Sequence, residues 1–307
     1  MTAMKRFLHI LFFTFVCAGL SAQTLPSLLV SADGAVAGTG GLAVAARPGA
    51  WSLENNAAML PFQDGRLAAA VSYGMWQPSF ANDKVLGAGV SFKASDRLSF
   101  GLIARNFAMP QYTVVNELGA ESQVNGTFSP KESTIGLGGA FALSDHFSVG
   151  VAAKMTSSSL ARDAKAGVFG ADVSLAYNQD ALRAGFSVCN LGGGVDYGGG
   201  SHAQPALARA GVSYGLGNAA VSAITLGAEA DYLFSGGLMA GVGAEYAFKQ
   251  LAFVRAGFHY GDAAKAVPSY ASLGLGVHVG GLVFDAAYLL ASETVGGSLC
   301  ITLGYSF

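Results

Sequence analysis

Few residues of this sequence could carry out catalysis, and the histidines are the main candidates. Ser272, His278 and Asp285 lie close together in the sequence. A serine hydrolase needs these residue types within mutual reach, but no nucleophile-elbow spacing accompanies them. We expect His259 and His278 to point inward from strands and to join a hydrogen-bond network there. The sequence therefore predicts that the protein is not an enzyme.

Metal and phosphate sites also lack their usual spacing. No cluster of His, Cys and carboxylate residues has the spacing of metal ligands. The glycine runs 192–194 and 198–200 are not followed by a helical pattern, which indicates flexible surface loop and no phosphate cradle. Cys189 and Cys300 fall in separate expected strands, and we expect them to be small buried fillers. No cofactor is predicted.

A larger group of charged residues sits on the small or polar face of the expected strands. Both signs occur in near balance. They are Lys93, Arg105, Lys154, Asp172, Arg183, Arg209, Glu229, Asp231, Glu245, Arg255 and Asp285. Charges in a low-dielectric interior must be paired, so one interpretation is a network of ion pairs that braces a barrel wall. The other is a polar passage with little ion selectivity, and the sequence does not separate the two.

Composition indicates the kind of element that carries these charges. The 307 residues are 52% hydrophobic and 12% charged, with mean hydropathy +0.44, which is unusually apolar for a soluble domain. After residue 22 the apolar runs are too short for a membrane-spanning helix, which needs about 20 residues. With 43 Gly and only 8 Pro, a closed sheet is the remaining way to span a membrane. A net charge of −2 excludes nucleic acid as a partner.

The amino-terminal residues have the pattern of a secretory signal. Lys5 and Arg6 precede an apolar run from Phe7 to Leu20, and Ser21 and Ala22 complete a cleavage site. The apolar run is shorter than a membrane anchor requires. We therefore predict a signal peptide over residues 1–22, cleaved after Ala22.

A period of two residues recurs along the remainder of the chain. In the last segment, Leu299, Ile301, Leu303, Tyr305 and Phe307 alternate with small or polar residues. Short turns, such as 95–96, 215–218 and 249–250, alternate along the chain with mostly longer connections, such as 77–82 and 111–130. Outer-membrane barrels have short periplasmic turns and long extracellular loops, whereas a β-sandwich has no reason to alternate them.

These patterns predict an all-β fold: a transmembrane antiparallel β-barrel of about 14 strands over residues 63–307, beginning with the strand 66–76. An even strand number puts both termini in the periplasm, and lipid of the cell outer membrane of a Gram-negative bacterium surrounds the wall. The terminal aromatic residues Tyr305 and Phe307 resemble the signal that the barrel-assembly machinery reads.

The segment before the barrel has a different character. Residues 23–62 are rich in Ala and Gly and show no strand alternation. About fourteen strands enclose a lumen too wide for wall side chains to fill. We therefore expect this segment to be a plug inside the barrel.

The same segment carries a resemblance to a known family. The run from Leu28 to Ala45, LLVSADGAVAGTGGLAVA, and the run from Trp51 to Phe62, WSLENNAAMLPF, resemble the start of the PorV/PorQ family of Bacteroidota, whose barrel and plug resemble the FadL long-chain fatty-acid transporters. A hairpin at 141–154 is also typical of it. The matching motif residues are Gly40, Gly41, Asn56, Ala58 and Leu60, whereas Ala57 stands where the family usually has proline.

The resemblance implies two functions that use one architecture. The first is a factor associated with type IX secretion, which binds or shuttles secreted protein substrates and works with other secretion-system components. The second is a FadL-like transporter or channel for a hydrophobic small molecule. Apolar residues in the connection 111–130 suit either function, and they also suit a loop that lies at the membrane boundary. On resemblance we favour the secretion-associated function.

Overall fold

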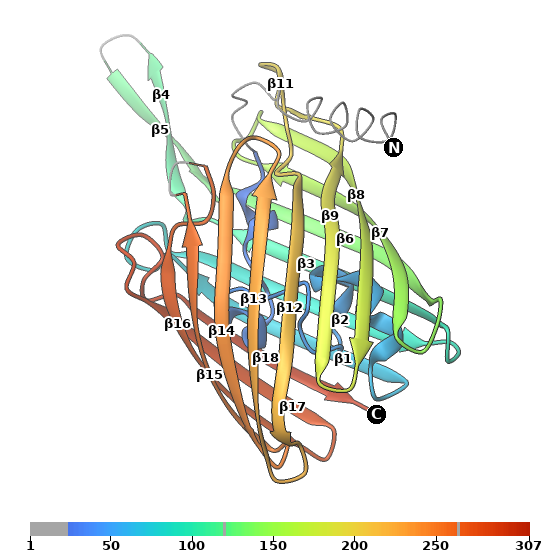
Figure 1. Ribbon diagram of the computed structural model, residues 1–307. Helices are drawn as coiled ribbons and strands as arrows, with labels where there is room; N and C mark the ends of the chain where they lie inside the picture. Colours follow the sequence, from blue (N-terminus) through green and yellow to red (C-terminus); the bar gives the residue numbers. More distant parts are fainter. Residues whose placement is uncertain (1–23, 119–120, 263–264) are drawn as a thin grey trace, which may run out of the picture.

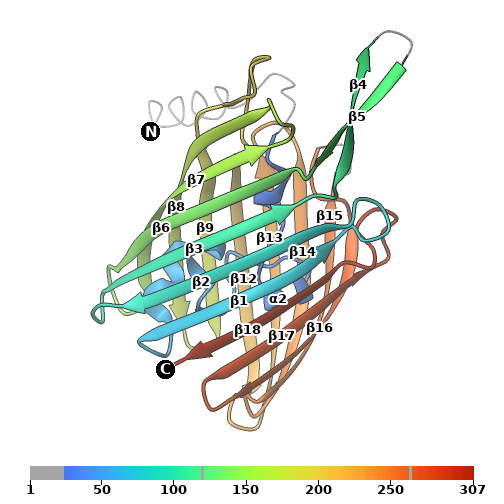
Figure 2. The same ribbon diagram turned by 180° about the vertical axis from the view of Figure 1, so that it is seen from behind.

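Alternating apolar and small residues produce long strands that close on themselves. The computed structural model describes residues 24–118, 121–262 and 265–307. Over these residues, fourteen antiparallel strands pair in one closed barrel, as Figures 1 and 2 show from opposite sides. The barrel strands are β1 (Leu67–Trp76), β2 (Asp83–Lys93), β3 (Leu98–Ala108), β6 (Lys131–Ala142), β7 (Phe147–Ser159), β8 (Lys165–Gln179), β9 (Leu182–Gly192), β12 (Leu207–Asn218), β13 (Ser222–Leu233), β14 (Leu238–Phe248), β15 (Ala252–Gly261), β16 (Tyr270–Val279), β17 (Leu282–Leu290) and β18 (Leu299–Ser306).

Closure joins the two ends of the sheet. β1 pairs with β18 in continuous register from Ala68 opposite Ser306 to Met75 opposite Leu299. No strand edge is therefore left unpaired in the wall, which is what a sheet needs in order to span a membrane. The predicted antiparallel barrel of about fourteen strands is confirmed.

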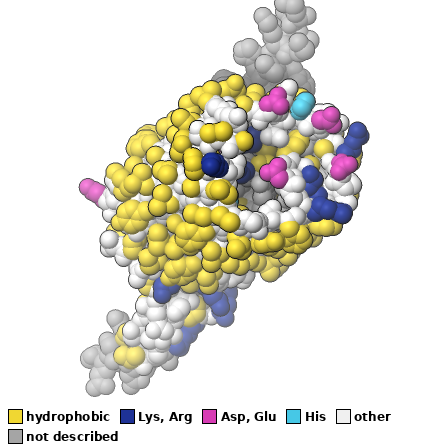
Figure 3. All heavy atoms as spheres, turned by 90° about the horizontal axis from the view of Figure 1, so that it is seen from below, with side chains coloured by type: hydrophobic (Ala, Val, Ile, Leu, Met, Phe, Trp, Pro, Cys, Tyr) yellow, Lys and Arg dark blue, Asp and Glu magenta, His cyan; other side chains and the backbone are white. Residues whose placement is uncertain are grey.

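The two faces of the wall differ as the alternation predicts. Large apolar side chains such as Val71, Leu137 and Leu275 are exposed on the outside, while Ser72 and Ser187 are buried on the inside. Figure 3 shows hydrophobic side chains covering the visible part of the outer wall. Such a surface is stable only against lipid, so this is an outer-membrane barrel.

Connections at the two ends of the barrel differ in length. At the turn end, short turns join pairs such as β2 and β3 or β16 and β17. At the loop end lies a hairpin of β4 (Tyr112–Leu118) and β5 (Glu121–Phe128), which projects beyond the barrel in Figures 1 and 2. The shorter pair β10 (Val195–Asp196) and β11 (Ser201–His202) also lies in a loop-end connection.

One predicted turn is wrong. Residues 215–218 belong to β12, because its pairing with β13 continues to Asn218 opposite Ser222. The turn therefore occupies residues 219–221. Gly217 has a positive φ of 101° at the end of this strand, a conformation that glycine adopts without strain.

The described residues before β1, from Thr24 onward, run through the barrel interior. Within this part of the chain there are four short helices: η1 (Pro26–Leu29), α2 (Gly34–Gly38), α3 (Ser52–Asn55) and η2 (Ala57–Phe62). The backbone N–H of Thr24 donates to Ala203 O at the loop end (3.3 Å), and at the turn end Gln63 O accepts from Lys93 Nζ (3.0 Å). We call residues 24–63 the N-terminal segment.

The described part of the chain begins and ends at opposite ends of the barrel. Thr24 lies at the loop end, whereas Phe307 lies at the turn end, where its N–H donates to Leu67 O (2.9 Å). The first described residue is thus a barrel length away from the C-terminus, because the N-terminal segment crosses the lumen before β1 begins. The predicted signal peptide lies outside the described residues. Among those described, no helix has the length and apolar character needed to cross a membrane.

Candidate functional site

Small polar side chains of the wall hold the backbone of the N-terminal segment. Gly34 N donates to Thr302 Oγ1 (3.0 Å), and Gly40 N donates to Ser272 Oγ (3.0 Å), whose own hydroxyl donates to Gly38 O (3.0 Å). These bonds satisfy backbone groups that a short helix leaves without partners at its ends. Ser272 is thereby committed to the segment and is not joined to His278 as a hydrolase would require.

Gly40 and Gly41 allow the backbone to approach the wall closely. Both have positive φ, 77° and 84°. A Cβ on Gly40 would lie 2.9 Å from the backbone N and O of Phe258, whereas one on Gly41 would lie 3.3 Å from Tyr270 Oη. On the wall, a Cβ on Gly257 would lie 2.2 Å from Thr39 C. Glycine on both sides therefore makes this contact possible.

Asn56 caps the last helix of the segment, η2, just before Ala57. Its Oδ1 accepts from Ala58 N (3.0 Å), and its Nδ2 donates to Val44 O (2.8 Å) and Leu175 O (3.2 Å). The side chain thus caps η2 and ties it to both the segment and β8. Ala57 takes the first helical position of η2, and the Asn56 cap fixes where this helix begins. Leu60 is fully buried against the wall.

An ion-pair chain runs along the inner wall near the turn end, over β14 to β17, and reaches the N-terminal segment at Arg47. Arg255, which is only 2% exposed, contacts Glu245 Oε2 through Nε (2.7 Å) and Asp285 Oδ1 through Nη1 (2.5 Å). Arg47 of the segment contacts the other oxygen of Glu245 (3.1 Å), and His278 Nε2 lies 3.2 Å from Asp285. These charges are close enough for each to offset the cost of burying its neighbour.

Five more of the predicted inward charges also have partners. Lys154 pairs with Asp172 (2.8 Å), and Arg209 lies 3.4 Å from Asp231. Glu229 Oε2 accepts from Val44 N of the segment (2.7 Å).

Three wall cations are held mainly by the N-terminal segment. Arg105 pairs with Glu54 (2.8 Å). Lys93 Nζ donates to Gln63 O, and Arg183 Nε donates to Ala45 O (3.2 Å). All eleven predicted lumen charges thus lie on the inner side of the wall.

Sequence reasoning missed the charged residues of the segment itself, Asp33, Arg47 and Glu54. In the sequence they stood out only as a few charged residues within a stretch rich in Ala and Gly. Asp33 caps α2 by accepting from Ala35 N (2.9 Å), and its Oδ2 accepts from Asn55 Nδ2 (2.9 Å). Burial, and secondarily the charge of Asp285, raises the pKa of Asp33 to about 6.

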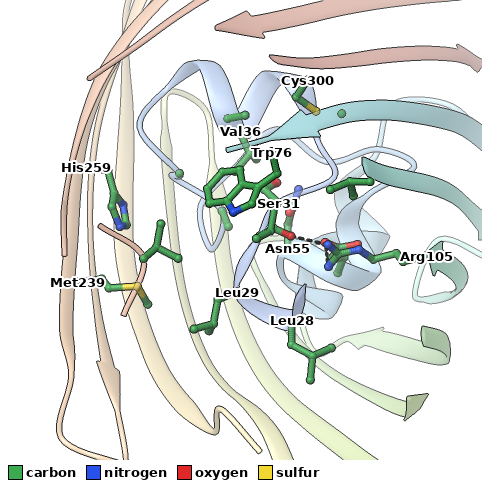
Figure 4. Close-up of a pocket in the computed structure, with 18 of the residues that line it drawn as sticks. Leu28, Leu29, Ser31, Val36, Asn55, Trp76, Arg105, Met239, His259 and Cys300 are labelled. Carbon is green, nitrogen blue, oxygen red and sulfur yellow. Dashed lines mark hydrogen bonds and ion pairs between the residues drawn. The ribbon is translucent and has the colours of Figure 1, made fainter. Parts of the chain in front are cut away.

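Two cavities lie on either side of α2, and Val36 borders both. The loop-end cavity, of about 90 Å³, is lined by Leu28, Leu29, Trp76 and Met239 together with polar groups such as Arg105 and His259. Figure 4 shows these side chains around it. His259 stacks on Tyr270 at 4.8 Å. Over the described residues, no group of three His, Cys, Asp or Glu side chains has a metal-binding arrangement.

The second cavity, which we call the turn-end chamber, is larger, at about 540 Å³. Its lining includes Leu42, Arg47, Trp51, Arg183 and Val283. Figure 3, a view from the turn end, shows a hollow with charged side chains around it. The N-terminal segment therefore stands between a small loop-end cavity and a wider turn-end chamber.

The C-terminal strand completes the wall. Tyr305 and Phe307 are exposed on its outer face, with ring centroids 5.5 Å apart. Leu67 N also donates to Phe307 O (2.9 Å), so the last residue is paired to the first strand.

Comparisons with known proteins agree with this geometry. The family model described as "Type IX secretion system protein PorV" matches residues 20–236. No curated protein matches the sequence.

Solved structures with a similar fold include hydrocarbon transporters and a FadL homologue. The toluene transporter TodX of Pseudomonas putida has a TM-score of 0.61 at 12% identity, covering 89% of this chain and 97% of its own. The toluene transporter TbuX of Ralstonia pickettii has 0.55 at 14% identity, covering 91% and 99%. A FadL homologue of Pseudomonas aeruginosa has 0.53 at 15% identity, covering 94% and 100%. At these identities the likeness shows the fold alone.

Proposed function

Because the chain belongs to the PorV family of type IX secretion system proteins, we propose that it binds secreted protein substrates at the outer membrane, outside its own lumen. The family consists of FadL-like barrels that are not enzymes. The observation that carries the proposal is the contrast between an occupied lumen and a hairpin that projects from the loop end.

The N-terminal segment obstructs the lumen. It crosses the lumen from Thr24 at the loop end to Gln63 at the turn end, and many of its residues, such as Val44 and Ala58, are fully buried. We assign residues 1–22 as the signal peptide, 23–62 as the plug and 63–307 as the barrel. A plug with this many buried contacts blocks passage of a protein chain, so substrates must contact an outer surface.

The β4–β5 hairpin offers such a surface. Val124 is 71% exposed and Val115 is 49% exposed, although the hairpin lies beyond the lipid-facing wall. A two-stranded sheet also has open edges with free backbone donors and acceptors, which suit pairing with an extended segment of another protein. The hairpin is thus the loop-end element best suited to a protein partner.

The orientation follows from the two barrel ends. We place the short turns and the C-terminus in the periplasm and the β4–β5 hairpin outside the cell, as in other outer-membrane barrels. Tyr305 and Phe307 then end the last strand on the side from which the barrel-assembly machinery inserts the protein.

Transport of a hydrophobic molecule, as the names of TodX and TbuX state for those proteins, is the second candidate. The loop-end cavity is the natural entry site for it. Its volume of about 90 Å³ is below the ~150 Å³ of an engineered cavity that holds benzene. This conformation therefore has no room there for a monoaromatic ligand, and we favour protein binding.

The test is recovery of secreted proteins with variants of the hairpin. Val124→Asp should lower the amount of secreted protein that co-purifies with the detergent-solubilised barrel, because a charge enters the apolar contact. Phe80→Asp is the matched control, since Phe80 is also an exposed apolar residue (78%) but lies in the connection between β1 and β2. Equal recovery from Val124→Asp and the unmodified protein would refute the assignment.

A further inference from the structure

Three lysines lie in one row across the outer face of the wall. They are exposed, and each is on the same face of its strand as exposed apolar residues such as Ile135 of β6. Figure 2 shows the strands concerned, β2, β3, β6, β7 and β8, side by side. Their registers join one continuous row of cross-strand partners: Lys84, Ala108, Lys131, Ser159 and Lys165. We call the three lysines the basic row, in which successive backbones are about 10 Å apart across two strand spacings.

The basic row lies at the loop end, beyond the apolar part of the wall. The next outward row towards the turn end is polar, with Asn106, Ser133 and Ser157 as cross-strand partners. Asn106 Nδ2 donates to Ser133 Oγ (2.9 Å). The row after that is apolar and includes the exposed side chains of Ile135 and Phe169. It is four residues, or about 13 Å along the strand, from the basic row. This change in polarity places the basic row at the level of lipid headgroups.

The charge of the basic row is not neutralised by the protein. Within the described part of the chain, no carboxylate lies within 4.0 Å of any of the three ammonium groups. The adjacent carboxylates in the sequence, Asp83 and Glu132, are buried on the inner face. Arg162 and Asp163, in the connection between β7 and β8, have opposite signs and leave the net charge of this sector unchanged. The basic row therefore has three positive charges available to an external anion.

The remainder of the wall differs from this sector. Among the described strand residues, no other lysine or arginine is exposed on the outer face. Near the loop end of β13 to β15 the exposed outward residues are instead apolar or aromatic, such as Tyr232, Leu238 and Tyr260. Positive charge is thus confined to the sector β2–β8, from which the β4–β5 hairpin rises between β3 and β6.

From these observations we infer that the basic row binds the phosphate groups of lipopolysaccharide, the glycolipid of the outer leaflet. Ammonium groups bind phosphate oxygens, and each basic residue close to an anionic headgroup surface strengthens binding about fivefold. The apolar row below then contacts the acyl chains of the same molecule. The inference rests on the proposed orientation, which puts the loop end outside the cell, and not on the proposed binding of secreted proteins.

The test measures binding of lipid A, the phosphorylated membrane anchor of this glycolipid. Fluorescently labelled lipid A and its dephosphorylated form are titrated with the full chain in a non-ionic detergent at low ionic strength, where exposed charges are least screened. Fluorescence anisotropy reports the bound fraction. The loop-end variant combines Lys84→Gln, Lys131→Gln and Lys165→Gln. The matched control removes the same charge at exposed turn-end positions, through Arg66→Gln, Arg97→Gln and Lys249→Gln.

Lipid A should bind the unmodified protein and the turn-end control equally, and the loop-end variant at least about tenfold more weakly. The dephosphorylated form should bind the unmodified protein as weakly as lipid A binds the loop-end variant. Millimolar inorganic phosphate should not displace lipid A, because headgroup and acyl chains bind together. If the loop-end variant lacks the heat-modifiable folded form, its three single substitutions replace it, and each should weaken binding about fivefold.

Several outcomes would overturn the inference. They are equal affinity for the two forms of lipid A, unchanged affinity in the folded loop-end variants, and an equal loss in the turn-end control. Displacement by inorganic phosphate would assign the row to a free anion and contradict the lipid. The orientation is tested separately, because binding in detergent does not depend on it. Labelling of Gln179→Cys in place of Val124→Cys in intact cells would put the basic row in the inner leaflet, away from lipopolysaccharide.

Discussion

Replacement of Gly40 by alanine should detach the N-terminal segment from the wall. The new Cβ would lie 2.9 Å from backbone atoms of Phe258, and φ at this position is 77°. The left-handed conformation costs about 1–2 kcal/mol for a residue other than glycine, and overpacking an interior costs about 1–3 kcal/mol. The two contributions together destabilise the docked segment by roughly 2–5 kcal/mol.

Two further glycines make this prediction a graded series. Gly41→Ala has the conformational cost but only a tight contact of 3.3 Å with a side-chain oxygen, so it should cost about 1–2 kcal/mol. Gly49→Ala introduces a Cβ with nothing within 4 Å and should change stability by less than about 0.5 kcal/mol. The difference in stability between Gly40→Ala and Gly41→Ala isolates the clash with the Phe258 backbone.

The assay is urea titration of the purified protein, followed by the emission of Trp51 in the Trp76→Phe background. Trp51 is buried in the docked segment and becomes exposed when the segment leaves the lumen. The midpoints should fall in the order Gly49→Ala, Gly41→Ala, Gly40→Ala. A midpoint for Gly40→Ala equal to that of Gly49→Ala would refute the close packing of this segment.

Four other predictions test the remaining parts of the account. Cysteine labelling of intact cells should modify Val124→Cys at the loop end and not Gln179→Cys at the turn end, and the reverse pattern would contradict the orientation. Deletion of Phe307 should lower the yield of heat-modifiable protein, because its paired backbone bonds to Leu67 are lost, and an unchanged yield would contradict the assembly role. The pKa of Asp33 is raised to about 6, so the free energy of unfolding should fall by up to about 3 kcal/mol between pH 4 and 7, as this carboxyl group loses its proton. Asp33→Asn cannot ionise and should abolish this loss. Parallel curves of stability against pH for the two proteins would contradict the prediction. Deletion of residues 25–49 should raise conductance in planar bilayers, whereas unchanged conductance would place the segment outside the pore.

The barrel could be predicted from the sequence because its physical cause is local and repeated. Each strand alternates apolar and small residues, as in Leu303 and Tyr305 beside Thr302, and connection lengths distinguish the two barrel ends. Inward charges such as Glu245 and Arg255 follow from the same alternation. Their pairing across neighbouring strands required the register, which no single strand encodes.

The N-terminal segment was less predictable because its structure depends on contacts with the wall. α2 has five residues, too few for a helical period to be recognised, and it is held by groups far along the chain such as Thr302. The positive φ of Gly40 has no local signature. The direction in which the segment crosses the lumen also depends on tertiary contacts, and for that reason the loop-end position of Thr24 was not foreseen.

The β4–β5 hairpin was predicted as a long connection and not as strands. A register shift between Thr113 and Val115 breaks the alternation that would have identified it. Because the hairpin projects beyond the barrel, its two faces do not contact the lumen and the lipid respectively. Its residues therefore need not alternate between polar and apolar. Its exposed residues Val115 and Val124 are nevertheless the ones on which the proposed protein contact depends.

The central claim is that secreted proteins contact the outside of the loop end and do not pass through the lumen. The most direct measurement is photocrosslinking in cells from a photoreactive amino acid placed at Val124 of the hairpin or, in a separate strain, at Leu42 inside the barrel. We expect adducts with secreted proteins from position 124 and none from position 42. Adducts from position 42, or none from position 124 while secretion proceeds, would contradict it.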